Sequence, residues 1–160
     1  MDVRARYLVN TLFSDEPQAV LPKRCAIKIY RYKISEDEGT RDALDGQSMT
    51  VESCLCKQIY SSVAQTKEII EGVRRMTEDG LVDVEYPEET LHEIITNAVI
   101  HRDYSIPDDV HIRIYDNRVE VENPSVLPGH ITVENILGER FSRNGNIVRI
   151  INKFPNPSPK

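Results

Sequence analysis

The chain has 160 residues, of which 39% are hydrophobic and 29% charged, and its formal net charge is −6. This composition fits one ordinary globular domain or two small ones, and no apolar run approaches the ~18 residues that a membrane helix needs. The N-terminal segment lacks a signal-peptide pattern, and the three cysteines, Cys25, Cys54 and Cys56, have no metal-ligand spacing. We therefore expect a cytoplasmic protein with reduced thiols and no membrane partner.

In the first half of the chain, apolar spacing predicts a strand between two helices. Ile27 and Ile29 lie on one face of the strand, and the second helix has an apolar residue at every fourth position, with Ser48 or Thr50 as its cap. The predicted elements are a helix over 3–13, a turn over 14–22, a strand over 25–33, a loop over 35–48 with a short strand at 40–44, and a helix over 50–64.

In the second half, the stretch 67–76 is ambiguous between helix and strand, and Gly72 with its β-branched neighbours favours a strand. Asp116 and Asn117 form the tight turn of a hairpin, because Asn and Asp tolerate the positive φ of such turns. The other predicted elements are a turn at 78–80, an extended segment over 81–87, a helix over 88–102 that starts after Pro87, hairpin arms within 110–122, and short helices over 131–137 and 145–154.

These elements predict an α+β fold with a mixed β-sheet packed against helices. The sheet is expected to contain the strand near 25–33, the segments near 69–86 and the hairpin 110–122. The helices that cover it are expected near 50–64, 88–102 and 145–154. Packing of the hairpin against the helix over 88–102 is the test of this fold.

The helix over 88–102 carries three polar residues at intervals of four: Glu93, Asn97 and His101. Because a helix turns about 100° per residue, these side chains form one column at the edge of the buried face. A carboxylate can take a proton from water, an Asn oxygen suits Mg²⁺, and an imidazole can meet phosphate oxygens. The alternative is an amphipathic helix with ordinary polar residues at its rim.

The stretch 86-YPEETLHEIITNAVIHRDYS-105 resembles the N-box of the GHKL ATPase superfamily. The similarity is to a divergent subgroup found beside Schlafen AlbA-type domains, whose members are described as transcriptional regulators or RecG-related ATP-dependent DNA helicases. The runs 113-RIYDNRVEVENPSVLPGHIT-132 and 142-SRNGNIVRIINKFPNP-157 resemble later segments of that family, and residues 7–46 more loosely resemble the end of an AlbA-type region.

The resemblance implies an incomplete GHKL (Bergerat-like) ATP-binding α/β sandwich over residues 81–154. Residues 1–80 would then be the C-terminal part of an AlbA-type region with a connecting helix and strand. Residues 155–160 form a Pro-rich tail without regular structure. The family's second glycine-rich box and its lid would lie beyond residue 160. We therefore expect a fragment that does not hydrolyse ATP by itself.

The resemblance also implies site residues for Mg²⁺ and ATP. Glu93 would be the water-polarising base, and Asn97 would be the Mg²⁺ ligand that bridges to phosphate. His101 and Arg102 would line the phosphate side.

At the other end of the implied site, Asn123 stands where the superfamily has an Asp that contacts the adenine amino group. Ser125 and Val126 replace two glycines of the family pattern, and Gly129 is the glycine that remains in this loop. Glycine lets the backbone approach a nucleotide closely, whereas valine does not.

Three functions stay open at this stage. The first is a nucleotide-binding module of a DNA-linked transcriptional regulator or helicase-like protein. The second is a non-enzymatic interaction domain that keeps the fold without the ligand. Ser125, Val126 and the excess of acidic over basic residues favour this function. The third is a nucleic-acid-binding module, because residues 1–33 hold seven Lys or Arg against three Asp or Glu, with Tyr30 and Tyr32 among them.

Two other classes are excluded by missing motifs. The sequence has no G-x-x-x-x-G-K-[ST] phosphate loop, so it holds no complete motor ATPase. It also lacks a G-x-G-x-x-G after a strand, which is the usual dinucleotide fingerprint.

Overall fold

A computed structural model describes residues 10–20, 25–34, 41–77, 80–126 and 143–153. Residues 10–13 are helical. The elements that follow are α2 (Pro17–Val20), β1 (Ile27–Arg31), the 3₁₀ helix η1 (Arg41–Ala43), β2 (Met49–Val51), α3 (Leu55–Glu71), β3 (Arg74–Thr77), β4 (Gly80–Asp83), α4 (Glu88–His101), β5 (Val110–Ile114), β6 (Val119–Glu122) and α5 (Gly145–Ile151).

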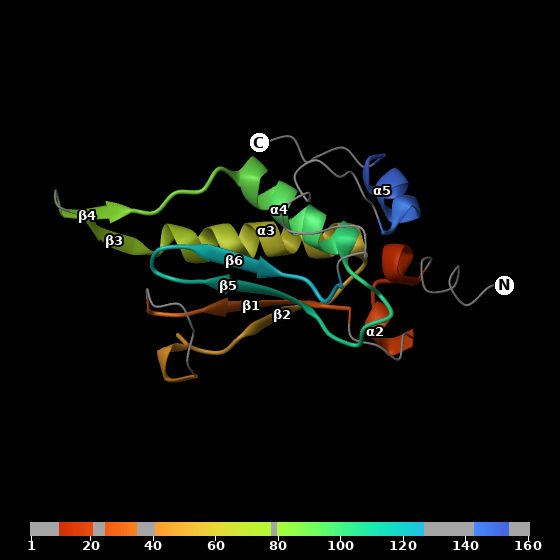
Figure 1. Cartoon of the computed structure of the whole chain (residues 1–160), viewed down its shortest axis with the longest axis horizontal. Coiled ribbons are helices and arrows are strands. Elements are labelled where there is room, and N and C mark those ends of the chain that lie inside the picture. The colour runs from red at the N-terminus through yellow and green to blue at the C-terminus, as the bar shows by residue number, and fades with distance from the viewer. Residues whose placement is uncertain (1–9, 21–24, 35–40, 78–79, 127–142, 154–160) are drawn as a thin grey trace.

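The main sheet has four strands in the order β2-β1-β5-β6. β1 is antiparallel to β2 and parallel to β5, while β5 and β6 form an antiparallel hairpin. Helices α3 and α4 lie on one side of this sheet (Figure 1). The α+β class and the mixed sheet are therefore confirmed, and strands from both sides of residue 80 share one sheet.

The core lies between this sheet and the two long helices. Ile27 and Ile29 of β1 pair in register with Val110 and Ile112 of β5, and all four are buried. Alternate residues of a strand point to the same face, so each strand contributes a row of branched side chains to the core. Full burial of such a side chain contributes roughly 1.5–3 kcal/mol. The helices add Leu55, Ile59, Val63, Leu91, Ile95 and Val99.

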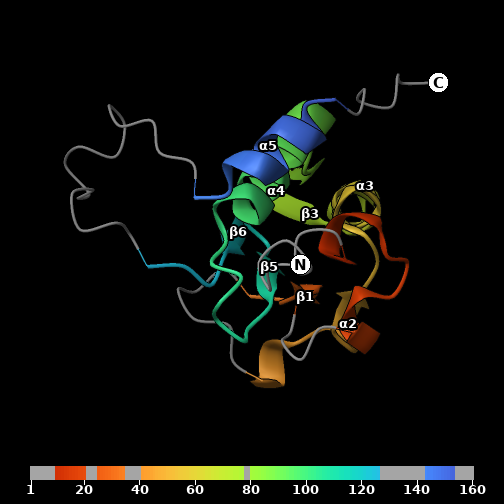
Figure 2. The same cartoon turned by 90° about the vertical axis from the view of Figure 1, so that its right-hand side faces the viewer.

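Helix α4 is the element that joins the layers. It packs against α3 along its length and against β6, so the predicted packing of the hairpin on this helix is confirmed. Helix α5 packs on α4 on the side away from the sheet (Figure 2). The predicted helices over 88–102 and 145–154 are present, with α5 ending at Ile151.

The predicted helix over 50–64 was wrong at its start. Residues 49–51 form β2, and Val51 is buried because it pairs with Ile27 of β1. The four-residue interval between Val51 and Leu55 therefore joins a strand to a helix. Helix α3 begins after Cys54, which makes no side-chain cap, so neither Ser48 nor Thr50 is its cap.

The prediction for 67–76 was partly wrong, because α3 continues to Glu71 and only residues 74–77 are extended. β3 and β4 form a separate two-stranded sheet that does not join the main one. Figure 1 shows this hairpin projecting from the end of the helix layer. Gly80 has φ +118°, which suits the predicted turn at this position.

Smaller differences concern turns. Residues 17–20 of the expected turn form the short helix α2, and residues 41–43 form η1 where a short strand was expected. The hairpin loop is longer than predicted, because Ile114 pairs with Val119 and leaves four residues between them. Neither Asp116 nor Asn117 has a positive φ.

Some predictions concern residues outside the described ranges, namely the helix over 131–137 and the tail over 155–160. Within the described ranges, no helix has both the length and the apolar character needed to cross a lipid bilayer.

Candidate functional site

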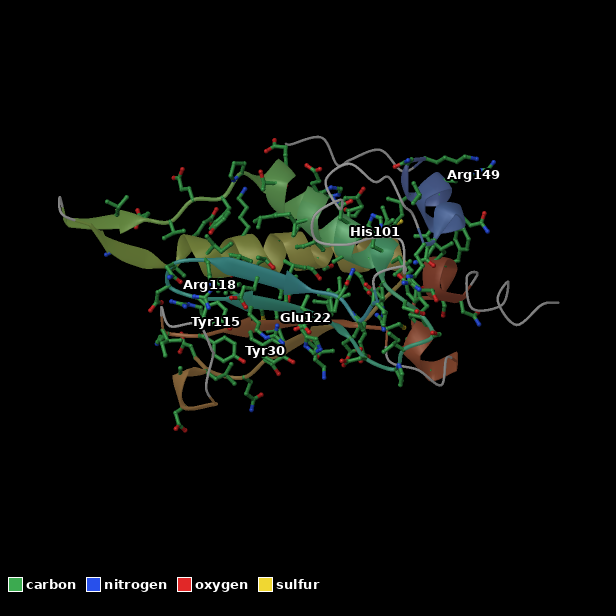
Figure 3. All side chains as sticks on the ribbon, in the orientation of Figure 1. Tyr30, His101, Tyr115, Arg118, Glu122 and Arg149 are labelled. Atoms are coloured by element: carbon green, nitrogen blue, oxygen red, sulfur yellow. The ribbon has the colours of Figure 1, made fainter. Side chains whose placement is uncertain are left out.

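Helix α4 presents one face to the core and another to solvent. Leu91, Ile95 and Val99 are buried, whereas Glu93 and Asn97 are exposed. His101 is half-buried and lies in the last turn (Figure 3). The helix thus places the carboxylate and the amide of the predicted column on its open face. The helix starts after Pro87, whose fixed φ suits a helix start.

An apolar side chain interrupts this open face. Ile94 is 44% exposed and follows Glu93 directly. Thr90, one turn earlier, is also exposed. A carboxylate, an amide and a branched apolar side chain are therefore offered together on the solvent side of α4. Such a mixture suits a ligand with both polar and apolar parts better than a bare ion.

The C-terminal end of α4 is held by side chains from three other segments. The last carbonyls of a helix have no partner within the helix. Here Asn123 Nδ2 donates to the Ala98 carbonyl at 3.2 Å, and Tyr104 Oη donates to that of Val99 at 3.1 Å. Asn144 Nδ2 donates to the carbonyls of Ile100 and Arg102, both at 2.7 Å. The end of α4 is therefore tied to the residues that follow β6 and to the start of α5.

An ion pair reinforces this end of the helix. Arg143 Nη1 donates to Asp103 Oδ2 at 2.9 Å, and Arg143 Nη2 donates to the Val126 carbonyl. The other oxygen of Asp103 accepts from the backbone and the hydroxyl of Ser105. The Asp103 backbone N–H donates to the Pro124 carbonyl at 3.0 Å. Asp103 therefore connects three chain segments.

Arg102 is buried where the chain leaves α4. Its side chain is 2% exposed, and its Nη2 donates to the Asp108 carbonyl. The guanidinium carbon lies 5.1 Å from the centre of the Tyr104 ring, within reach of a cation–π contact. The side chain thus holds the loop between α4 and β5 against the body of the protein.

Tyr104 is partly buried and belongs to the same arrangement. Burial raises the pKa of its phenol well above the ordinary value, because the ionised oxygen would lose hydration. The phenol therefore stays protonated at neutral pH and remains a hydrogen-bond donor to Val99. This keeps the last turn of α4 fixed.

The electrostatics of this end favour a cation. The aligned peptide dipoles give a helix C-terminus a partial negative charge, which favours a nearby cation. Asn97 offers a neutral oxygen, and Glu93 is one turn away on the same face. Neither side chain takes part in a hydrogen bond or ion pair within the described part of the chain. The Asn97 amide oxygen therefore fits a Mg²⁺ ion that takes its other ligands from phosphate and water.

Among the residues that the structure describes, no group of three or more His, Cys, Asp or Glu side chains could hold a metal ion. Mg²⁺ is usually bound by few protein groups together with substrate phosphates.

Asn123 lies next to the column but is already engaged. Its Nδ2 bonds the Ala98 carbonyl, and its Oδ1 accepts from Ser125 Oγ at 3.1 Å. One N–H and one lone pair of the amide remain for other partners. The bond to Ala98 brings the residue after β6 beside the turn that holds Asn97. Gly129, the other residue expected at this end, lies outside the described ranges.

The helix-free face of the sheet gathers aromatic rings. Tyr30 stacks on His111 and Tyr32, with ring centres 5.8 and 6.3 Å apart, and Tyr32 stacks on Tyr115 at 5.3 Å. Figure 3 shows Tyr30, Tyr115 and Arg118 on this side. Because the rings stack on each other, fewer ring faces are free for bases.

The basic residues on this face have acidic neighbours. Arg113 pairs with Glu122 at 2.6 Å, and Arg118 pairs with Glu120 at the same distance. Lys28 lies 3.4 Å from Asp109. Binding to nucleic-acid phosphates requires more basic than acidic side chains on the surface. These ion pairs therefore weaken the hypothesis of a nucleic-acid-binding module.

A groove of ≈ 510 Å³ lies at the opposite end of α4. Its floor contains Ile70 and Leu91, and Lys67 and Glu88 form an ion pair of 2.7 Å at its rim. Glu93, Asn97 and His101 do not line it. This groove is thus separate from the polar column, so shape and chemistry indicate different sites.

Sequence reasoning missed the residues that hold α4. Asn144, Arg143 and Tyr104 were part of the quoted family segments but received no role. Their functions depend on partners 5 to 44 positions away, which no periodicity encodes. The segments that contain Asp103 and Arg143 both resemble the same family. This shared resemblance is a signal that could have indicated a contact between the two residues.

Comparisons with known proteins give a family match, a structural similarity and one negative result. Residues 108–156 match the family model described as "Putative ATP-dependent DNA helicase recG C-terminal". This is less than half of the chain, and it covers β5, β6 and α5 but not α4. It supports an ATPase-like character for this part. No curated protein matches the chain.

The fold is similar to that of the DIP2311 protein from Corynebacterium diphtheriae, a crystal structure, with a TM-score of 0.58 and 20% sequence identity. The similarity covers 81% of this chain and 27% of that one, so this chain spans about a quarter of the length of that protein. At this identity, the likeness concerns the fold alone.

Proposed function

We propose that the open face of α4 and the residues after β6 form the metal-facing half of an ATP-binding site. The protein would act as part of a DNA-linked transcriptional regulator or a RecG-related, ATP-dependent helicase-like protein. The family match over residues 108–156 and the α/β sandwich fold support an ATPase-like domain. The resemblance of residues 86–105 to an N-box supports α4 as the helix that meets the nucleotide.

Each residue of the column has a proposed task. Glu93 polarises the attacking water, since a carboxylate is a suitable general base. Asn97 binds Mg²⁺ through its amide oxygen, and the ion bridges to phosphate oxygens. His101 lies on the phosphate side, where its half-buried position in the last turn leaves part of the ring accessible. Arg102 has a structural task because its side chain is buried.

The observation that carries the proposal is the bond between Asn123 and Ala98. Asn123 Nδ2 lies 3.2 Å from the carbonyl oxygen of Ala98, the residue that follows Asn97. The bond thus holds the residue after β6 against this turn of α4. A ligand with its metal at Asn97 would therefore have a second polar amide nearby. The remaining N–H and lone pair of Asn123 suit an adenine edge.

The test is a ¹⁵N–¹H NMR titration with Mg-ATP on three chains: wild type, Asn97→Ala and Asn146→Ala. Asn146 is an exposed Asn on α5, so its substitution is a matched control. We expect shifts at residues 93–101 and 122–126 in the wild type and the control. We expect these shifts to disappear in Asn97→Ala, because the metal loses its only proposed protein ligand.

Wild-type spectra without shifts at millimolar Mg-ATP would contradict nucleotide binding by this chain. Equal shifts in wild type and Asn97→Ala would contradict the role of Asn97. A parallel titration with ATP and excess chelator separates metal-dependent contacts from binding of the free nucleotide.

A second function is favoured by one observation. Ser125 Oγ donates to Asn123 Oδ1, the oxygen that an adenine amino group would have to share with it. A protein that had lost its ligand could keep the fold in this way and act as a non-enzymatic interaction domain. Ser125→Gly separates the two functions: it should strengthen Mg-ATP binding if the site is used, and leave an empty site unchanged.

A further inference from the structure

Two segments that the proposed chemistry does not use meet at the end of α4. One is Asp103 with its neighbours, and the other is Arg143 with Asn144. The Arg143 guanidinium donates to the Asp103 carboxylate with one nitrogen and to the Val126 carbonyl with the other. Asn144, the next residue, donates to the carbonyls of Ile100 and Arg102.

The side chains of this pair are partly buried. The exposed fractions are 27% for Arg143 and 21% for Asp103. Water therefore screens the pair less than it screens the exposed ion pairs elsewhere on α3 and α4. A planar guanidinium can hold two acceptors in fixed directions at once, whereas a lysine ammonium acts as a point charge.

The geometry links this pair to the open face of α4. Asn144 and Asn123 bind carbonyls of the last turn, which follows Asn97 and contains His101. Arg143 also donates to the Val126 carbonyl, so it holds the residues that follow β6 beside that turn. The orientation of Asn97 and His101 relative to the residues after β6 therefore depends on Arg143.

We propose that Arg143 is a positioning residue of the nucleotide site, acting through Asp103, Val126 and the adjoining Asn144 without touching the ligand. This inference rests on the proposed function. It predicts that nucleotide affinity falls when the Asp103–Arg143 pair is broken, although both side chains lie away from the column of Glu93 and Asn97.

The experiment measures the Kd of Mg-ATP for wild type, Arg143→Met, Arg143→Lys, Asp103→Asn and the double variant. Arg149→Met is the control, because Arg149 is an exposed arginine on α5 (Figure 3) and its loss changes the net charge equally. We expect Arg143→Met and Asp103→Asn each to raise Kd by about three- to thirtyfold. Arg143→Lys should recover part of the loss, and Arg149→Met should bind like wild type.

The double variant tests whether the two residues act as one unit. We expect its Kd for Mg-ATP to be no higher than that of the single variant with the higher Kd. The reason is that each single substitution already removes the interaction between the two side chains. Amide spectra of α3 and the sheet should be unchanged in every variant, which separates repositioning from unfolding. Asp103→Asn keeps an oxygen for Ser105, so it is the mildest variant and the one best able to fold.

The outcomes are distinct. Wild-type binding with unchanged affinity in both single variants would overturn the positioning role and leave the proposed function intact. Additive losses in the double variant would also overturn it, since the residues would then act separately. Absence of wild-type binding would contradict the proposed function itself, and the inference would fall with it.

Discussion

The two ends of helix α4 are held in different ways. At the N-terminal end, Pro87 precedes the helix without a side-chain cap, and an exposed Lys67–Glu88 pair connects it to α3. At the C-terminal end, Asn123, Tyr104 and Asn144 satisfy four carbonyls.

The difference indicates which end of α4 has the better defined conformation. A helix without caps can fray at its end, while satisfied carbonyls and partly buried partners keep the last turn in one conformation. The proposed site residues Asn97 and His101 lie toward the tied end. The groove of ≈ 510 Å³ lies at the other end, where the contacts are exposed.

The largest effect should come from the core that lies under both ends. Ile95 is fully buried in the middle of α4. Ile95→Ala should lower the free energy of unfolding by about 2–5 kcal/mol, because it removes apolar contacts and leaves a cavity. Urea unfolding monitored by circular dichroism measures this. A loss below that of the end variants described next would mean that α4 is held mainly by its ends.

The tied end should respond next. Asn144→Ala removes the donor that serves two carbonyls, so we expect a loss of about 2 kcal/mol. Asn146→Ala, two residues further along, is the matched control and should stay close to wild type in the same urea titration. Equal stability of the two variants would show that the Asn144 amide is not a structural tie.

A smaller effect is expected from Tyr104→Phe, which removes only the bond to the Val99 carbonyl. The expected loss is about 1 kcal/mol at neutral pH. Because burial raises the pKa of Tyr104 in the folded state, the folded protein keeps this proton more firmly than the unfolded chain. Stability should therefore fall as pH rises above the ordinary phenol value of 10.0.

The pH dependence sharpens that test. The fall above the ordinary phenol pKa should be less steep in Tyr104→Phe, which has no phenol to ionise at this position. Thermal unfolding of both chains across the alkaline range gives the comparison. Parallel curves would contradict the coupling between burial and ionisation.

The smallest effect should come from the exposed end. The hydrogen bond from Lys67 lowers the pKa of Glu88, so this pair stabilises the folded state when the carboxylate is ionised. Its contribution is present above the ordinary Glu value of 4.5 and disappears as pH falls through the lowered pKa. Glu88→Gln should thus be slightly less stable than wild type at neutral pH and equal to it in acid. Salt should reduce the neutral difference, and a salt-independent difference would contradict a screened surface pair.

Several elements could be predicted from the sequence because their signals are local. The alternation of Val110, Ile112 and Ile114 predicted β5, and the helical repeat of apolar residues that includes Leu91 and Ile95 predicted α4. These patterns hold because strand and helix periods determine which side chains face the core.

Other features depend on partners far away in the sequence. Val51 and Leu55 have helical spacing, yet Val51 belongs to β2 through its pairing with Ile27. The sequence of the β3–β4 hairpin has the pattern of any other pair of strands. No local feature of that sequence shows that the hairpin lies outside the main sheet. Strand pairing and sheet membership are non-local properties, so periodicity cannot determine them.

The candidate site was foreseen in part for the same reason. Helical spacing indicated that Glu93, Asn97 and His101 form a column. It could not indicate that Arg102 turns inward to Asp108. Arg102 follows the last residue of α4, so the helical repeat no longer determines the direction of its side chain. Nor could it indicate that Asn123 is bonded to Ala98, 25 positions earlier.

The central claim is that a nucleotide-bound metal sits at Asn97, on the open face of α4. The most direct measurement replaces Mg²⁺ by paramagnetic Mn²⁺ and records the broadening of amide signals on adding Mn-ATP. The account predicts broadening centred on residues 93–101 with weaker effects at 122–126, and almost none at the β3–β4 hairpin. Broadening centred on the groove around Glu85 and Glu88, or spread evenly over the acidic surface, would contradict it.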